Sequence, residues 1–296
     1  MAPSTRGRPA GREEVAERVG VLLEALPYIR QFAGATIVVK YGGAAMTTPD
    51  LKASFARDVA LLRLVGMNPV VVHGGGPDIS QYSDRLGLEV RFVHGLRVTD
   101  APTMELVKMV LVGKINKEIV AQLHVAGAPA VGLAGDDGGL ITASKAETPD
   151  ADLGFVGQVE AIDATVLERL SDFVPVVASV GVDREGQSYN INADTVAGEL
   201  AAALGARKVI FLTDVEGLYQ DPADPSTLIS AITVGELDRL LAKERTVGSG
   251  MIPKLLAVRE ALTHGVPAAH IVDGRVPHSV LIELFTEGGI GTMVSR

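Results

Sequence analysis

Two segments of this chain join a β-branched run to a glycine turn, and they constrain the fold more than any other feature. They read TIVVKYGGAA, from Thr36 to Ala45, and VVVHGGGPD, from Val70 to Asp78. Near-continuous Val and Ile runs are typical of strands buried on both faces, as in parallel sheets. Because ligands of open α/β sheets bind at the carboxyl ends of strands, the two turns are expected to face one site. Neither turn matches a Walker loop or G-x-G-x-x-G.

Strand-like and helix-like runs alternate along the rest of the chain. Strands are predicted at TIVVK, PVVVH, FVPVVASV and KVIFLT, and helices at LKASFARDVALLRLVG and DTVAGELAAALG. This alternation indicates βαβ units on a parallel sheet, and therefore an α/β sandwich. The segments VRFVHGLRVTD, LITASKA and GFVGQVEAI are predicted to form hairpin strands that decorate the first half.

The segment before the first strand has helical periodicity. Pro27 is expected to kink this helix, because proline removes a backbone donor and clashes one turn back. The helix either folds onto its own core or forms an arm that packs on another subunit. One face of it carries the apolar residues Val15, Val19, Leu22, Leu26 and Ile29.

Composition excludes several classes of function. Cysteine is absent, which removes thiolate nucleophiles, iron–sulfur ligation and disulfides. The formal charge of −9 and the 4% aromatic content argue against a nucleic-acid partner. The most apolar runs are too short to cross a bilayer, and the N-terminus lacks the apolar region of a secretory signal. We therefore expect a folded protein of the cytoplasm with a short disordered leader and no structural metal.

The glycine turns are candidate phosphate sites. A lysine near the end of the first strand, Lys40, is followed by Gly42 and Gly43, so that backbone N–H groups could approach an anion which the ammonium neutralises. Gly74, Gly75 and Gly76 could do the same after the next strand. Taken singly, each glycine run is more simply a tight turn.

Four further residues have both a structural and a chemical interpretation. Lys254 follows Pro253 at a helix start, where a cation is unfavourable unless it is solvated or meets a bound phosphate. Asp194 is either a helix N-cap or a carboxylate that aims two lysines. Asn190 and Asn192 flank it as neutral partners for a polar substrate.

Other polar residues near the predicted turns have simpler interpretations. Arg97 could clamp a carboxylate bidentately, or form a surface salt bridge. Asp136 and Asp137 precede two glycines, which favours a turn over a metal site. His73 is interpreted as a strand-end residue, because no second metal ligand is suitably spaced.

Six motifs stand in one order along the chain: VVKYGG, VVHGGGPDI, GLRVTD, YNINAD, LTDVEGLY and SGMIPK. In this the chain resembles the acetylglutamate kinases of the amino-acid kinase family, from Thr36 to Arg296. The resemblance implies a three-layer αβα sandwich with a mainly parallel central sheet, preceded by the kinked helix. It also implies a leader and helical arm at 1–33 and one kinase domain at 34–296, with an acetylglutamate lobe at 34–204 and a nucleotide lobe at 205–296.

The same resemblance implies roles for individual residues. Lys40 and Lys254 would neutralise the phosphoryl group in flight, and Asp194 would organise both. Acetylglutamate would be bound by Gly75, Gly76, Arg97, Asn190 and Asn192. ATP would be bound by Gly42, Gly43, Thr213, Asp214, Gly217, Tyr219, Gly250 and Met251. Mg²⁺ would be held mainly by the nucleotide, since the chain offers no dedicated carboxylate cage.

Arginine-inhibited members of the family resemble this sequence at both ends. They have an N-terminal kinked helix that interlaces dimers into a hexamer, and a C-terminal stretch like HIVDGR followed by ELFTEGGIGTM. An arginine site is thus implied at Tyr28, Lys208, His270, Glu283 and Gly289. The alternative is that His270 and Glu283 are ordinary strand-end and helix residues.

Three other functions compete with this one. The chain could phosphorylate a related acid, such as aspartate or the acetylated aminoadipate homologue. A regulator that binds nucleotide and senses arginine without turnover is a second alternative, although it would not need both lysines and Asp194. A nicotinamide dehydrogenase ranks last, because its G-x-G-x-x-G fingerprint is missing.

Overall fold

A single eight-stranded sheet forms the centre of the molecule in the computed structural model, which describes residues 12–149, 151–221, 223–242 and 251–296. Its strand order is β14-β16-β15-β11-β1-β2-β8-β5, and within it only the β15–β16 pair is antiparallel. The prediction of an α/β fold with a mainly parallel central sheet is confirmed. The first four of these strands come from after residue 205 and the other four from before it. The sheet therefore runs without interruption through both expected lobes.

The strands are short, and helices or turns separate them along the chain. They are β1 (Thr36–Tyr41), β2 (Asn68–His73), β3 (Phe92–Val93), β4 (Leu96–Arg97), β5 (Ala130–Leu133), β6 (Ile141–Lys145), β7 (Val156–Ile162), β8 (Val174–Ala178), β9 (Val180–Val182), β10 (Ser188–Ile191), β11 (Lys208–Thr213), β12 (Leu218–Tyr219), β13 (Leu228–Ile229), β14 (Ala231–Thr233), β15 (Ala268–Asp273) and β16 (Thr292–Ser295).

Helices connect most of the parallel strands. They are α1 (Arg12–Phe32), α2 (Pro49–Leu64), α3 (Gly76–Leu86), α4 (Ala101–Lys108), α5 (Asn116–Val125), α6 (Thr165–Arg169), α7 (Ala193–Ala203), α8 (Val234–Leu241), α9 (Ile252–Thr263) and α10 (Ser279–Phe285). Short helical turns are η1 (Gly43–Met46), η3 (Asp137–Gly139) and η4 (Pro225–Thr227), and η2 (Met109–Ile115) is a π-helical segment that joins α4 to α5.

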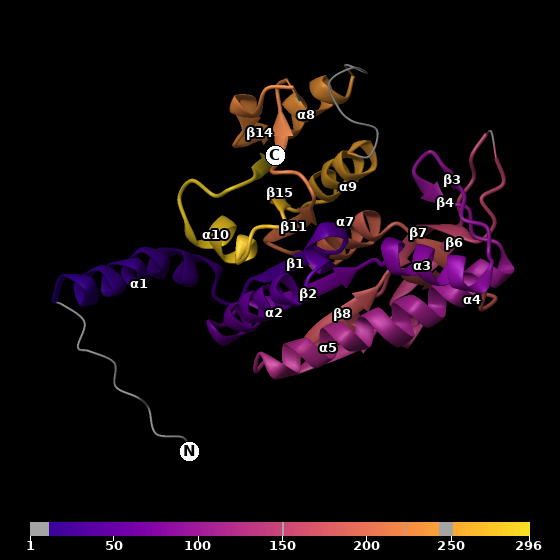
Figure 1. Cartoon of the computed structure of the whole chain (residues 1–296), viewed down its shortest axis with the longest axis horizontal. Helices are drawn as coiled ribbons and strands as arrows, with labels where there is room; N and C mark the ends of the chain where they lie inside the picture. Colours follow the sequence, from indigo (N-terminus) through magenta and orange to yellow (C-terminus); the bar gives the residue numbers. More distant parts are fainter. Residues whose placement is uncertain (1–11, 150, 222, 243–250) are drawn as a thin grey trace.

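Both faces of the central sheet are apolar and covered by helices. Ile37, Val39 and Val71 belong to a core cluster with residues of α2 and α5. Val38 and Val72, which alternate with them, belong to a second cluster with residues of α7 and α9. Because successive strand residues point to opposite faces, this division makes three layers. Figure 1 shows α2 and α5 lying along the strands β1, β2 and β8.

The site described below depends on which strands are neighbours. β1 and β2 pair in parallel with Tyr41 opposite His73, so the two glycine turns leave the sheet side by side. β11 lies on the other side of β1 and β15 follows it, with Thr213 opposite Asp273. The helices α7 and α9 pack against each other over this region. Four chain segments therefore meet at one edge of the sheet.

Irregular strands decorate the first half, as predicted. β3 and β4 form one hairpin, and β6 and β7 pair in an antiparallel manner within a small closed sheet with β9 and β10. The prediction of one strand through FVPVVASV was wrong at its end, because β8 stops at Ala178 and Val180 already belongs to β9. Ser179 lies between the two sheets and donates its N–H to the carbonyl of His73.

The N-terminal helix α1 extends away from the body of the molecule (Figure 1). Its last turn packs on the core through Phe32, whereas Val19, Leu23 and Leu26 are exposed. Pro27 lies inside the helix, which continues through it as one element. The last turn therefore folds onto the core, and packing of the rest of the helix on another subunit stays a prediction. The side chains of Val15 and Leu22, which belong to the expected apolar face, lie outside the part of the chain that the structure describes.

No helix in the described part of the chain is long and apolar enough to span a bilayer.

Candidate active site

The glycine turns after β1 and β2 line the same cavity, of about 240 Å³. Its wall is completed by the β3–β4 hairpin, the end of β10 and the start of α7. The predicted site residues that line it are Lys40, Gly42, Gly43, Gly75, Gly76, Arg97, Asn190, Asn192 and Asp194. Segments far apart in the sequence therefore share one cavity at the carboxyl edge of the sheet.

Asp194 lies between two lysines. Its Oδ1 atom is 3.1 Å from Lys40 Nζ, and its Oδ2 atom is 3.1 Å from Lys254 Nζ. Lys40 comes from β1, Asp194 from the first turn of α7 and Lys254 from the first turn of α9, so three elements must pack correctly to form this group. Lys254 is 7% exposed, which excludes the interpretation of a solvated surface lysine.

The start of α7 explains why Asp194 is free to bind the lysines. Asn192 is the N-cap of this helix, and its Oδ1 accepts hydrogen bonds from the N–H groups of Asp194 and Thr195. The alternative that Asp194 itself caps the helix is therefore wrong. The Asp194 side chain lies at the positive end of the helix dipole, where a carboxylate is favoured.

Electrostatics keep this group charged. Burial alone would raise the pKa of Asp194, but the charges of Lys40 and Lys254 and their hydrogen bonds hold it below its usual value. Burial lowers the pKa of Lys254, and the charge of Asp194 opposes that effect. Two ammonium groups share one carboxylate, so the cluster has a net positive charge within a chain of formal charge −9. It is suited to an anionic ligand.

Arg97 lies on another wall of the same cavity and has spare hydrogen-bonding capacity. Its Nη2 atom donates to the Gly76 carbonyl at 2.9 Å and to Ser80 Oγ at 2.7 Å. Its guanidinium lies over the ring of Phe92, 4.7 Å from the centroid. Nη1 is buried without a hydrogen-bond partner among the described residues. A buried unpaired donor of a charged group is costly, so this atom is suited to a ligand carboxylate.

The side chain of Asn190 is only partly engaged. Its Nδ2 atom donates to Thr99 Oγ1 at 3.2 Å, and its position at the end of β10 puts it in the cavity wall. Ser179 also lines the cavity, although the sequence drew no attention to it. Sequence reasoning would have found Ser179 only if it had predicted that the strand in FVPVVASV ends just before this residue.

Gly43 and Gly75 require glycine for different physical reasons. Gly43 has a φ of 57°, a conformation that L residues rarely adopt. Gly75 has an extended φ, but a Cβ atom there would collide with Ile115 and would lie 2.7 Å from Leu111 Cδ2. Gly43 therefore turns the chain, whereas Gly75 allows Leu111 and Ile115 to pack closely on the second turn.

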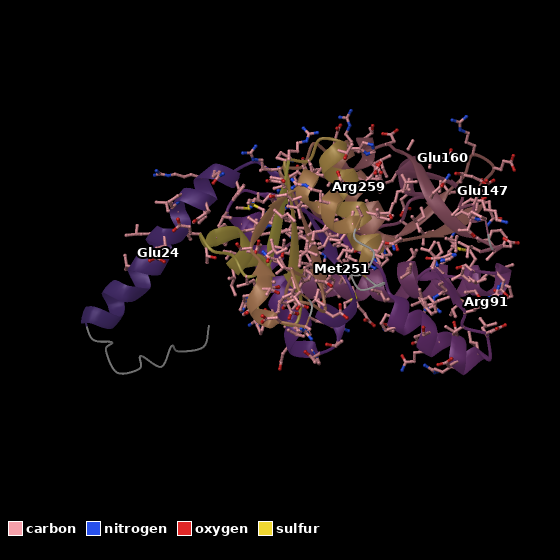
Figure 2. The ribbon with its side chains drawn as sticks, turned by 90° about the horizontal axis from the view of Figure 1, so that it is seen from above. Glu24, Arg91, Glu147, Glu160, Met251 and Arg259 are labelled. Carbon is pink, nitrogen blue, oxygen red and sulfur yellow. The ribbon has the colours of Figure 1, made fainter. Side chains whose placement is uncertain are left out.

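The residues expected at the nucleotide lie around the ends of β11 and β12. Thr213 ends β11 and donates its hydroxyl to Asp214, and the hydroxyl of Tyr219 donates to Glu216. A Cβ atom on Gly217 would lie 2.5 Å from Thr292 Oγ1, so this glycine permits close packing. Met251 lies just before α9 and is labelled in Figure 2. Gly250 lies outside the described residues.

Two charged residues beside this group were missed. Asp273 ends β15 next to Thr213, and it binds Arg275 through both carboxylate oxygens, at 2.9 Å and 2.8 Å. The motif HIVDGR contains both residues. It reads as a strand that ends in a charged turn at the ligand-binding edge of the sheet, and this pattern could have pointed to them. Asp214 and Glu216 lie close enough to raise the pKa of Arg275, after the larger effect of Asp273.

A second cavity, of about 470 Å³, lies between the end of α1 and α10. It is lined by the five residues of the expected arginine site, Tyr28, Lys208, His270, Glu283 and Gly289. Burial lowers the pKa of His270, against the hydrogen bond with Glu283. His270 Nδ1 lies 2.6 Å from Glu283 Oε1, and its Nε2 lies 2.9 Å from Lys208 Nζ. These residues are thus not isolated surface groups.

Glu283 is more occupied than the sequence suggests. Its Oε2 atom also accepts from the N–H groups of Ile290 and Gly291, at 2.8 Å and 3.1 Å. The side chain is buried, and a Cβ on Gly289 would lie 2.6 Å from Oε2. A guanidinium in this cavity would therefore meet a carboxylate that is already fixed in place.

The described residues contain one cluster of three possible metal ligands, Glu199, Glu260 and His264. It lies on α7 and at the end of α9 and does not line the cavity of Lys40 and Asp194. The expected turn at Asp136 and Asp137 is confirmed: Asp137 accepts the Ala134 N–H, and Asp136 pairs with Lys108.

Known proteins resemble this chain over nearly its whole length. Acetylglutamate kinases from Symbiobacterium thermophilum and from a Nostoc species are each 54% identical to it, over 96% of this chain and 99% and 95% of theirs. The solved structure of N-acetylglutamate synthase from Neisseria gonorrhoeae, complexed with coenzyme A and N-acetyl-glutamate, superposes with a TM-score of 0.83 at 26% identity. The match covers 94% of this chain and 63% of that longer one.

More distant structures share the fold alone. Carbamate kinase from Giardia lamblia, bound to AMP-PNP, has a TM-score of 0.63 at 18% identity and covers 89% of this chain and 99% of its own. The sequence profile of the amino acid kinase family matches residues 35–273, which include both glycine turns, Asp194 and Lys254. The chain therefore belongs to the amino acid kinase family.

Proposed function

We propose that this protein transfers the γ-phosphoryl group of ATP to the side-chain carboxylate of N-acetyl-L-glutamate, a step of arginine biosynthesis in the cytoplasm. The observation that carries the proposal is the group of Lys40, Asp194 and Lys254 at the cavity of the two glycine turns. The identity of 54% to acetylglutamate kinases supports the choice of substrate.

The reaction requires little acid–base chemistry from the protein. The side-chain carboxyl of a glutamate ordinarily has a pKa of about 4.3, so it is ionised at neutral pH and attacks phosphorus without a general base. One carboxylate oxygen bonds to the γ-phosphorus as the bond to the bridging oxygen breaks, and ADP leaves. Lys40 and Lys254 stabilise the charge that spreads over the transferred group. Asp194 keeps the two ammonium groups apart and aimed.

Recognition of the acid uses the opposite wall. The unpaired Nη1 atom of Arg97 binds the α-carboxylate, and Asn190 and Asn192 contact the acetylamino group. The N–H groups of Gly43, Gly75 and Gly76 are donors to the phosphoryl group and the acid. The segment 34–204 thus forms the acetylglutamate lobe, following the arm at 1–33.

The nucleotide occupies the other lobe, 205–296, at the ends of β11 and β12. Its contacts are Thr213, Asp214, Gly217, Tyr219 and Met251, together with Gly42 at the first turn. Mg²⁺, bound mainly by the phosphates of the nucleotide, would supply further neutralisation of the transferring group. No cluster of metal ligands lines the cavity in the described part of the chain, which fits this arrangement.

Regulation by arginine uses the second cavity. Glu283 and His270 are buried residues of its wall, and Tyr28 lines it from α1. A guanidinium is a planar donor that suits the fixed carboxylate of Glu283. The N-terminal arm links dimers into a hexamer through its exposed apolar residues. Because the arm also lines this cavity, arginine binding and assembly of the hexamer affect each other.

Trapping of the acyl phosphate tests the proposed reaction directly. The purified protein is incubated with ATP, Mg²⁺ and hydroxylamine, and with acetylglutamate, aspartate or acetylated aminoadipate in parallel. Hydroxamate should form fastest with acetylglutamate. A faster reaction with aspartate or aminoadipate would select the related acid kinase. The absence of both hydroxamate and ATP consumption, with arginine binding retained, would favour the sensor that lacks turnover.

A further inference from the structure

A buried polar network lies behind the second glycine turn. His73, the last residue of β2, is fully buried, and its Nδ1 atom lies 3.1 Å from the carbonyl oxygen of Gly74. Its Nε2 atom lies 3.1 Å from Nδ2 of Asn116, which is also fully buried at the start of α5. Neither residue lines the cavity, so the network supports the turn from the inside.

The neighbours of Asn116 fix the direction of each hydrogen bond. Its Oδ1 atom accepts from Lys117 Nζ at 3.1 Å, and its Nδ2 atom donates to the Val176 carbonyl at 2.8 Å. The amide nitrogen therefore faces His73, whose Nε2 must accept. The imidazole then has its proton on Nδ1, which donates to the Gly74 carbonyl. Burial lowers the pKa of His73 to about 4, which keeps this neutral form at neutral pH.

That hydrogen bond sets the orientation of a peptide plane in the cavity wall. The carbonyl of Gly74 and the N–H of Gly75 belong to one peptide group, and the described chain contains no cis peptide bond. In a trans peptide the two groups point in opposite directions. Because the carbonyl points inward to His73, the Gly75 N–H points toward the cavity. Among the described residues this N–H has no hydrogen-bond partner.

Side-chain packing also constrains this turn. Leu111 and Ile115 of the π-helical segment η2 occupy the space that a Cβ on Gly75 would need. Asn116 follows directly on η2, so the residue that orients His73 and the residues that press on Gly75 come from one element. π-Helical segments are rare and are frequent at functional sites.

We propose that His73 and Asn116 are positioning residues for phosphoryl transfer, which hold the Gly74–Gly75 peptide so that its N–H is presented to the anion in the cavity. Neither side chain touches substrate. The assignment rests on the proposed function only for the identity of that anion. If the imidazole no longer donates, the peptide is free to turn its carbonyl toward the anion, where it repels negative charge instead of binding it.

Three variants separate positioning from stability. His73→Leu removes the donor, whereas His73→Asn keeps an N–H group near the position of Nδ1. Val71→Ala is the matched control, because Val71 is fully buried on the same face of β2 and two residues away. For each variant kcat and both KM values are measured beside the thermal midpoint. Crystal structures of the wild type and His73→Leu, both with ADP and acetylglutamate, report the orientation of the peptide.

His73→Leu is expected to lower kcat by on the order of tenfold or more, short of the ~10²–10³ for a deleted oxyanion donor. The KM for ATP should stay within about twofold, because the nucleotide contacts lie on other strands. His73→Asn should recover most of kcat, and Val71→Ala should lose stability with little change in kcat. Should His73→Leu not fold, Asn116→Ala, which frees the tautomer of His73, takes its place with the same expectations.

Several results would overturn the assignment: an unchanged kcat in His73→Leu, an asparagine variant no better than the leucine variant, or an unchanged Gly74–Gly75 peptide in its crystal structure. Failure of the wild type to form acyl phosphate is a different result. It would remove the proposed function, while the crystal structures would still decide whether His73 orients the peptide.

Discussion

At the scale of residues, the proposed chemistry depends on one carboxylate that two lysines share. Without Asp194, the ammonium groups of Lys40 and Lys254 would lie close together with no fixed counter-charge, and their repulsion would spread them. With it, both are fixed about 3 Å from the same side chain. Phosphoryl transfer needs preorganised positive charge more than proton transfer, so this arrangement matches the proposed reaction.

Lys254 provides the test at this scale. Lys254→Ala should lower kcat by ~10²–10³, the usual loss when one group that stabilises the transition state is removed. Lys145→Ala is the control, because Lys145 is about half exposed and pairs with Asp152 on the surface. Steady-state rates of hydroxamate formation give the comparison. Near-normal turnover in a folded Lys254→Ala protein would remove the role of this lysine.

How far single residues could be predicted depended on whether their signal was local. Lys40 and the glycines stand next to strands, so their place at the sheet edge followed from periodicity. The contact of Asp194 with Lys254 spans 60 positions, and only the order of motifs pointed to it. The roles of all these residues stay predictions. Arg275 was overlooked because HIVDGR was interpreted only as part of the expected arginine site, although a charged turn follows its strand.

At the scale of elements, near-continuous apolar runs predicted four of the eight central strands, β1, β2, β8 and β11. Ile37, Val38 and Val39 are all fully buried yet belong to different clusters, which is what a continuous apolar run on a two-sided sheet requires. The π-helical segment η2 was not predicted. It is only seven residues long, too short to set a period of its own in the sequence, and it packs Leu111 and Ile115 against Gly75.

The junction of α2 with α10 makes stability depend on pH. Asp58 is 1% exposed, and burial raises its pKa to about 6, although a hydrogen bond with His278 opposes the rise. The distance from His278 Nδ1 to Asp58 Oδ1 is 2.6 Å, and the His278 N–H donates to Ser54. Because the pKa in the folded protein exceeds the usual aspartate value of 3.8, this group stabilises the fold at low pH. That contribution is lost as the pH rises through about 6.

Asp58→Asn should remove this dependence, because asparagine stays neutral. The free energy of unfolding of the variant, relative to wild type, is expected to rise between about pH 4 and pH 6 by on the order of 1 kcal/mol per unit. Urea unfolding at several pH values measures it. Asp172→Asn, at an exposed position, is the control and should track wild type throughout. A difference that falls with pH would contradict the raised pKa.

At the scale of the whole molecule, one sheet holds the body together, whereas the helix α1 extends away from it (Figure 1). The sheet joins both proposed lobes into one layer, so relative motion of the lobes must twist the sheet where β1 pairs with β11. The helix α1 stands apart, and Figure 2 shows Glu24 on it far from Met251 at the start of α9. Its exposed Leu23 and Leu26 are apolar residues that a second subunit could cover.

Assembly through the arm gives the prediction at this scale. Deleting 1–33 would also remove the buried Phe32, so the sharper change is the double substitution of Leu23→Glu with Leu26→Glu. If α1 links dimers as proposed, two charges on its apolar face should reduce the proposed hexamer to dimers and weaken the proposed inhibition by arginine. The kcat without arginine should be retained, because α1 does not line the cavity of Lys40 and Asp194. Glu24→Gln is the control on the same helix. Light scattering and inhibition curves give both readouts, and a variant whose mass equals that of the control would rule out the arm as the contact between dimers.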